Sequence, residues 1–296
     1  MRKMRQATHW ESRDSVIQYL AKQLKSSTIS LVLGSGISTS FGLPDWDTLI
    51  LELSKGYNVP KGFSRLSAKQ QATIIRKDVF NNDISALNNE IRNVLYNNAS
   101  IDFESLQKEM LLVSLGALLM ASSRGSVSNV ITFNYDDILE TYLSFFGYTC
   151  ESAIDGVTWV SNKDVVVHHP HGFMPNDFTK PIQGEVVLDS SSFHSIMKDG
   201  SHWKNKLFSI LSSTFPIFIG VSGNDEHLQN HLEECKNNHV SIVQDKIPYW
   251  GIWFTTDSNS AIAKIWEDLK VYPFELSSWD ELPQVLFKIC QVAAKP

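Results

Sequence analysis

The stretch Thr28-Ile29-Ser30-Leu31-Val32-Leu33, followed directly by Gly34-Ser35-Gly36, decides the fold class of this chain. Its short run of apolar and β-branched residues predicts a buried strand, and the glycines predict a tight turn at the carboxyl end of that strand. Ahead of it, Asp14 to Lys25 carries apolar residues at helical spacing. A glycine turn placed after such a strand would let the backbone approach a pyrophosphate.

The rest of the chain alternates in the same way. Further strand candidates are Val130–Phe133, Val165–Val167, Glu185–Leu188, Phe215–Ile219 and Tyr249–Phe254, with helical patterns between several of them. Short apolar strands alternating with amphipathic helices predict an α/β, Rossmann-like, mostly parallel sheet with helices on both faces. Residues 47–125 show helical periodicity almost throughout. We therefore predict one domain over residues 1–296, interrupted after its first strand by a helical insertion at 47–125.

Composition narrows the class of protein. The chain has 296 residues, 43% of them hydrophobic, and a net charge of -6, so it lacks the broad basic surface of a dedicated nucleic-acid or anionic-membrane binder. The three cysteines, Cys150, Cys235 and Cys290, are too scattered for a disulfide framework or a four-cysteine zinc site. No apolar run reaches the ~18 residues that span a bilayer. We expect a cytoplasmic protein, and the eight Trp and 16 Phe residues permit a homo-oligomer.

Polar residues follow two of the predicted strands. The Gly34-Ser35-Gly36 turn lacks a third glycine at position 39, where Thr39 stands, which disfavours an ordinary hydride-transferring dehydrogenase and leaves a purely structural turn as an alternative. In Thr132-Phe133-Asn134-Tyr135-Asp136, Asn134 could hold a ribose hydroxyl or orient a water. Asp136 could bind a carboxamide or cap the next helix.

The histidines favour acid–base chemistry over metal binding. In His168-His169-Pro170-His171-Gly172 no cysteine or carboxylate lies close enough in sequence to complete a metal site, so one histidine is expected to act as a general base and two to be structural. Gly220 to Asp225 predicts a second phosphate- or ribose-facing loop. His227, His231 and Cys235 share one helical face, for which a solvated surface is favoured over a metal site.

Taken in order, these segments resemble the sirtuin family, and more closely its divergent bacterial branch of NAD-hydrolysing anti-phage defence proteins. Gly34-Ser35-Gly36-Ile37-Ser38 with Gly42-Leu43-Pro44-Asp45-Trp46 looks like the family's nucleotide-binding loop, normally G-A-G-I-S followed by G-I-P-D-F. Thr132-Phe133-Asn134-Tyr135-Asp136 is similar to its T-Q-N-x-D motif. His171-Gly172 matches the catalytic histidine–glycine pair, and Gly220-Val221-Ser222 matches the G-T-S loop. The resemblance runs from Leu31 to Ser222.

The resemblance implies NAD+ as substrate, with no metal, and cleavage of the bond between nicotinamide and ribose. Asn134 would position the nicotinamide ribose and the attacking water, Asp136 would hold the carboxamide with the Tyr135 backbone, and His171 would be the general base. The implied NAD+-binding residues are Gly34, Ser35, Gly36, Ile37, Asp45, Trp46, Phe133, Tyr135, Gly220, Ser222 and Asp225.

Departures from the family pattern shift the expected reaction. Protein-deacylating sirtuins carry a four-cysteine zinc module, which three dispersed cysteines cannot form, and the helical insertion takes its place. We therefore expect an NAD+ glycohydrolase that yields ADP-ribose, with water as acceptor, or its cyclic form. Alternatives are a non-catalytic NAD or ADP-ribose sensor, and a deacylase. Few residues follow Ser222, so a separate controlling protein is expected, such as a HerA-like ATPase by family analogy. Phe133 replaces the family glutamine.

Overall fold

The computed structural model describes residues 10–120, 125–127, 129–155, 163–223, 226–243 and 249–295. At its centre is a seven-stranded sheet with the order β3-β4-β2-β1-β5-β6-β7, in which every described pairing between strands is parallel. The strands are β1 Ile29–Leu33, β2 Asn129–Thr132, β3 Cys150–Ala153, β4 Val165–His168, β5 Phe215–Ile219, β6 Gly251–Thr255 and β7 Val271–Glu275. This confirms the predicted α/β class and its Rossmann-like parallel sheet.

Helices cover both faces of the sheet. All five residues of β1 are buried, as expected for a strand with packing on each side. Leu31 and Leu33 belong to an apolar cluster that includes residues of α1 Arg13–Lys25, α6 Met110–Leu119 and α12 Leu282–Ala293. Val32 points the other way, into a cluster built with α9 His202–Ser213, α10 Glu226–Val243 and α11 Ala261–Asp268.

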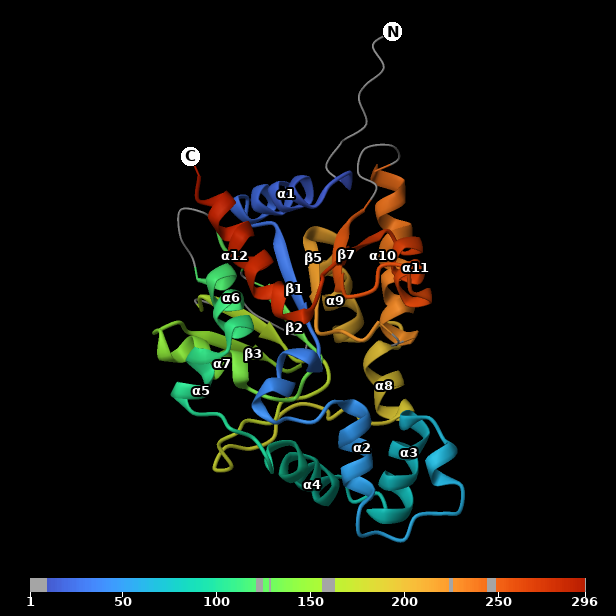
Figure 1. Cartoon of the computed structure of the whole chain (residues 1–296). Helices are drawn as coiled ribbons and strands as arrows, with labels where there is room; N and C mark the ends of the chain where they lie inside the picture. The colour runs from blue at the N-terminus through green and yellow to red at the C-terminus, as the bar shows by residue number, and fades with distance from the viewer. Residues whose placement is uncertain are drawn as a thin grey trace.

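Between β1 and β2 the described elements are helical. They comprise α2 Trp46–Ser54, α3 Ala68–Ile74, a π-helical turn at Ile75–Val79, α4 Ile84–Tyr96, α5 Phe103–Lys108 and α6, with short 3-10 turns between some of them. Figure 1 shows α2, α3 and α4 gathered at the end of the molecule opposite α1. The two remaining helices are α7 Ile138–Phe145 and α8 Ser190–Met197. That residues 47–125 form an insertion in one domain remains a prediction.

One expected strand is not formed, and two of the described strands were not expected. Glu185–Leu188 is not a strand: it lies outside the sheet without regular secondary structure, and its Val187 N–H donates to the His171 carbonyl at 3.0 Å. Conversely, β3 and β7 are strands that the periodicity did not indicate. Both occupy edges of the sheet, where one neighbouring strand is enough and an uninterrupted apolar run is not needed.

The expectation that α10 exposes His231 and Cys235 to solvent is also wrong. His231 is 2% exposed and Cys235 is fully buried, because both face the apolar cluster around Val32. The side chain of His227 lies outside the described residues. Acidic neighbours made this helix look solvated, but its packing against α9 buries one side of it.

Candidate active site

The site lies where the strand order reverses. β1 sits between β2 and β5, so the chain leaves β1 toward one edge of the sheet and later returns to β5 on its other side. In open parallel sheets, ligands bind in the crevice beyond the carboxyl ends of the strands at such a point. The turns after β1 and β5 meet there: Gly34 N–H donates to the Ile219 carbonyl at 3.0 Å, and Gly36 N–H donates to the Gly220 carbonyl at 3.2 Å.

This close approach gives the glycines a structural role. A Cβ on Gly34 would lie 2.4 Å from the Gly220 carbonyl oxygen, and one on Gly36 would lie 2.8 Å from the Gly220 Cα. Gly220 itself has a φ of +68°, in the left-handed region that favours glycine. The three glycines therefore let two turns pack together at the floor of the crevice.

A cavity of about 650 Å³ opens beyond these strand ends. Its volume falls within the range of small-molecule and cofactor sites. Eleven of the residues predicted from the sequence lie on its wall: Gly34, Ser35, Asp45, Trp46, Phe133, Asn134, Tyr135, Asp136, His171, Gly220 and Ser222. Gly36 and Ile37 support the turn without lining the cavity, and Asp225 lies outside the described residues.

Asn134 is held by its amide nitrogen. Nδ2 donates to the Gly34 carbonyl at 3.1 Å and to the Ser38 hydroxyl at 3.0 Å. A carbonyl oxygen only accepts, so the nitrogen of the amide must face Gly34, and both of its hydrogens are used inside the protein. The Asn134 Oδ1 atom is then the one suited to accept a hydrogen bond from a ligand hydroxyl or a water.

Ser38 joins Asn134 to Asp136. Its hydroxyl accepts from Asn134 and donates to Asp136 Oδ2 at 2.8 Å, while Asp136 Oδ1 accepts from the Ile138 N–H at 3.2 Å. Burial raises the pKa of Asp136 to about 6, partly offset by these two hydrogen bonds and reinforced by Glu140 and Asp137. A buried carboxyl group with such a pKa is typical of functional sites. Ser38 belongs to the glycine-loop motif, but the motif by itself does not predict that Ser38 links Asn134 to Asp136.

His171 stands beside two aromatic rings. Its imidazole centroid lies 4.9 Å from that of Phe133 and 5.5 Å from that of Phe193 of α8, and only 8% of the residue is exposed. Gly172 turns the chain directly afterwards with a φ of +96°, and a Cβ there would come within 2.9 Å of the Glu185 carbonyl oxygen. The histidine–glycine order therefore has a local reason: only glycine allows the loop to return along residues 185–187.

The other two histidines of the cluster point elsewhere. His168 is fully buried on the opposite face of β4, edge-on to Trp203, and burial lowers its pKa to about 3. His169 is also fully buried, but it contacts Glu140 and the Asn134 carbonyl. His171 is the one histidine among the residues lining the described cavity.

The helical region after β1 supplies one wall of the cavity. Ser67, Ala68 and Lys69 line it from the start of α3, and Leu95 lines it from α4. At the start of α8, Asp189 caps the helix and pairs with Arg76 at 2.6 Å, and the Lys69 ammonium lies 5.2 Å from the Phe193 ring centroid. Sequence reasoning missed these residues. Ser67 and Asp189 read as helix caps, but nothing local shows that the two helices meet.

The loop after His171 is fastened to α4. The guanidinium of Arg92, a residue that is 5% exposed, donates to the carbonyls of Lys180, Pro175 and Asp177 at 2.9, 2.6 and 2.5 Å. One turn further on, the Tyr96 hydroxyl donates to the Met174 carbonyl at 2.6 Å. The segment that presents His171 is thus held by α4 as well as by the sheet.

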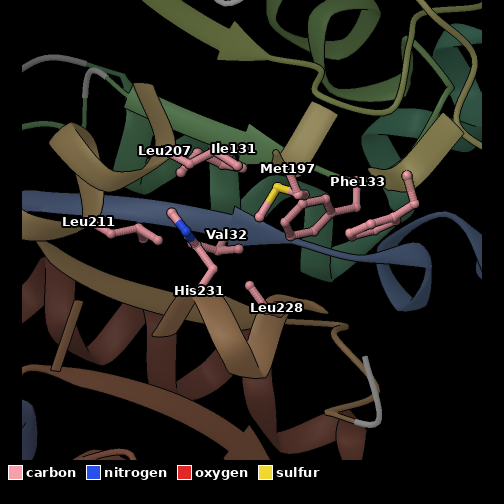
Figure 2. Close-up of a pocket in the computed structure, with 9 residues that line it drawn as sticks. Val32, Ile131, Phe133, Met197, Leu207, Leu211, Leu228 and His231 are labelled. Atoms are coloured by element: carbon pink, nitrogen blue, oxygen red, sulfur yellow. The ribbon is translucent and has the colours of Figure 1, made fainter. Parts of the chain in front are cut away.

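A small apolar chamber lies behind Phe133. Figure 2 shows Val32 and Ile131 of the sheet facing Leu228 and His231 of α10 across it, with Phe133 at one end. Phe133, Phe193 and Leu228 line both this chamber and the main cavity. Its free space of about 10 Å³ is at most that of one water, so these side chains serve as an apolar backing for the site.

The described residues show neither a metal-binding cluster nor a membrane-spanning helix. They contain no cluster of three or more His, Cys, Asp or Glu side chains able to hold a metal ion. Within the same part of the chain, no helix combines the length and apolar character required to cross a bilayer.

The fold and site together define a Rossmann-like α/β protein with a cavity at its topological switch point that both apolar and polar side chains line. Residues 128–274 match the family described as SIR2-like domain, a range that contains Asn134, Asp136, His171 and Gly220. This match supports a sirtuin-like family for the chain. The chain is also similar, at 15% identity and a TM-score of 0.45, to a solved structure described as "Structural Basis for the Mechanism and Regulation of Sir2 Enzymes", covering 94% of this chain and 96% of that one. No curated protein matches the sequence.

Proposed function

We propose that this protein is an NAD+ glycohydrolase, which cleaves the bond between nicotinamide and ribose and releases nicotinamide with ADP-ribose or its cyclic form. The SIR2-like domain supports NAD-dependent activity in general. The observation that carries the finer proposal is the presence of an amide, a buried carboxylate and an imidazole, from Asn134, Asp136 and His171, on the wall of one cavity.

These three groups suffice for the reaction. The pyridinium of NAD+ is cationic, so the C–N bond can break with its electron pair going to the ring nitrogen, and nicotinamide leaves neutral without needing a proton. Asp136 would accept from the carboxamide N–H, which orients the leaving group. Asn134 Oδ1 would accept from the water or ribose hydroxyl, and His171 would take the proton of the water as its oxygen bonds to the ribose carbon.

The acceptor is proposed to be water rather than an acyl-lysine. Cys150, Cys235 and Cys290 form no disulfide in the described residues, and they lie on three different elements, β3, α10 and α12. The π-helical turn after α3 and the start of α8 are in contact through Arg76 and Asp189, and Asp189 and Phe193 line the cavity on the side where Phe193 approaches His171. This arrangement supports a cavity that takes one dinucleotide and water.

In the cell, we place this activity in anti-phage defence, where it would deplete NAD+. A glycohydrolase without restraint would exhaust its host's NAD+, so the active arrangement must be favoured only when a controlling partner is bound. A HerA-like ATPase is the proposed partner, and the active form is proposed to be a homo-oligomer.

The test is nicotinamide release by the purified protein, alone and with the candidate partner. Asn134→Ala and His171→Ala should each abolish release while the circular dichroism spectrum is retained. His202→Ala, on an exposed position of α9, is the control and should leave release unchanged. If the protein binds NAD+ but releases no nicotinamide, either alone or with the partner, it is a sensor and not an enzyme. Formation of O-acyl-ADP-ribose from an acylated peptide would replace it with a deacylase.

A further inference from the structure

His169 connects four segments beneath the cavity. Its Nε2 lies 2.7 Å from Glu140 Oε1 of α7, and its Nδ1 lies 3.3 Å from the Asn134 carbonyl oxygen. Its backbone N–H donates to the Ala153 carbonyl at the end of β3, and its ring packs edge-on against Phe173 at 4.6 Å. The ring is fully buried, and the Glu140 side chain is 12% exposed.

The two contacts define which ring atoms carry hydrogens. A backbone carbonyl only accepts, so Nδ1 must donate to Asn134. The partner of Nε2 is a carboxylate, which in its ionised form also only accepts. With its hydrogen on Nδ1 the ring binds the Asn134 carbonyl, while the Glu140 carboxyl group contacts the other ring nitrogen. Ser152 donates to the same Glu140 oxygen at 3.2 Å, which further fixes that carboxylate.

Asn134 is consequently held from two sides. Gly34 and Ser38 fix its side-chain amide, and His169 fixes its carbonyl, in the short connection between β2 and α7. The direction of Asn134 Oδ1 depends on both constraints. Small displacements of a group that orients a reactant can cost about 100-fold in rate.

We propose that His169 and Glu140 form a positioning pair for Asn134, in which the Nδ1–H of His169 sets the backbone from which the Asn134 amide is presented to the substrate. This rests on the proposed function, because the role of Asn134 in glycosidic cleavage is part of it. Neither residue lines the cavity. The pair therefore acts through Asn134, and its loss should affect kcat more than the KM for NAD+.

Two variants of similar size separate the contacts. In His169→Asn the amide nitrogen can occupy the place of Nδ1 and keep the bond to Asn134, whereas in His169→Gln it can occupy the place of Nε2 and keep only the bond to Glu140. We expect His169→Asn to retain kcat within about fivefold, and His169→Gln to lose about 30-fold or more, with KM changed less than about threefold in both. Glu140→Gln, which keeps an acceptor oxygen, should exceed Glu140→Ala in kcat.

His168→Asn is the matched control. It removes an equally buried imidazole from the neighbouring position, on the opposite face of β4, and should lower thermal stability without lowering kcat more than about twofold. Equal activities of the Asn and Gln variants at 169, or kcat losses that simply follow melting temperature across all variants, would overturn the positioning role.

An activity-independent measurement separates this inference from the proposed function. The side-chain amide signals of Asn134 in a ¹⁵N-labelled sample, assigned by their loss in Asn134→Ala, should be retained in His169→Asn and shifted in His169→Gln. If the wild-type protein releases no nicotinamide in any state, the proposed function fails while this measurement still tests the pair. Unshifted signals in both variants would refute the pair directly.

Discussion

Replacing Asp136 by asparagine should stabilise the protein near neutral pH while it impairs the site. The substitution keeps the shape of a side chain that is 6% exposed but removes its charge. Burial raises the pKa of this carboxyl from 3.8 to about 6. The shift of about 2.2 pH units corresponds to about 3 kcal/mol at pH 7.5, at ~1.4 kcal/mol per unit. Asparagine has one acceptor oxygen instead of two, and losing one hydrogen bond costs about 1 kcal/mol. The net gain is therefore about 2 kcal/mol.

The sign of the stability difference between Asp136→Asn and the wild type depends on pH, because the folded and unfolded states bind the Asp136 proton with different pKa values. Between pH 3.8 and about 6 the folded protein holds the Asp136 proton and the unfolded chain does not, so this group makes stability fall as pH rises. Asp136→Asn removes that decline. The variant should be about 1 kcal/mol less stable than the wild type near pH 4 and about 2 kcal/mol more stable above pH 7, with the crossover between.

Urea unfolding of both proteins at several pH values between 4 and 8 measures this difference. Asp14→Asn, on an exposed position of α1, controls for removing an acidic charge and should show no such crossover. A stability difference that stays constant over this range, or an Asp136→Asn protein less stable than wild type at pH 7.5, would refute the reasoning that Asp136 is a buried charge kept for function.

Two further predictions concern residues that support the site. Ser38→Ala removes the donor that lowers the pKa of Asp136, so the pKa of Asp136 should rise further. The pH–activity profile for nicotinamide release should then move to higher pH, with about tenfold lower activity at pH 7. A profile that does not move would contradict the Ser38–Asp136 contact. Arg92→Ala leaves three carbonyls of the 175–180 loop without their donor. The free energy of unfolding in urea should fall by about 3 kcal/mol, and the loop should become sensitive to proteolysis. Lys180→Ala, at an exposed position of the same loop, should have neither effect.

The parallel sheet and most of its helices could be predicted from local pattern. β1, β2, β4, β5 and β6 are runs of apolar residues whose burial on both faces leaves a recognisable composition. The edge strands β3 and β7 were not predicted from the apolar pattern, because they are only partly buried. Glu185–Leu188 looked like a strand because three of its four residues are apolar, but its Val187 N–H donates to the His171 carbonyl, and no described strand pairs with it.

By itself the sequence determined which chemical groups are available and where in the chain they follow strands. Since parallel strands end at one edge of a sheet, Asn134, Asp136 and His171 were bound to lie near one another. Only the tertiary structure decided how they are held. Ser38 links Asn134 to Asp136, and His169 contacts Glu140. Arg92 binds the loop after His171, and Arg76 pairs with Asp189. These partners lie dozens of residues apart, and their meeting depends on how whole helices pack, which no local pattern encodes.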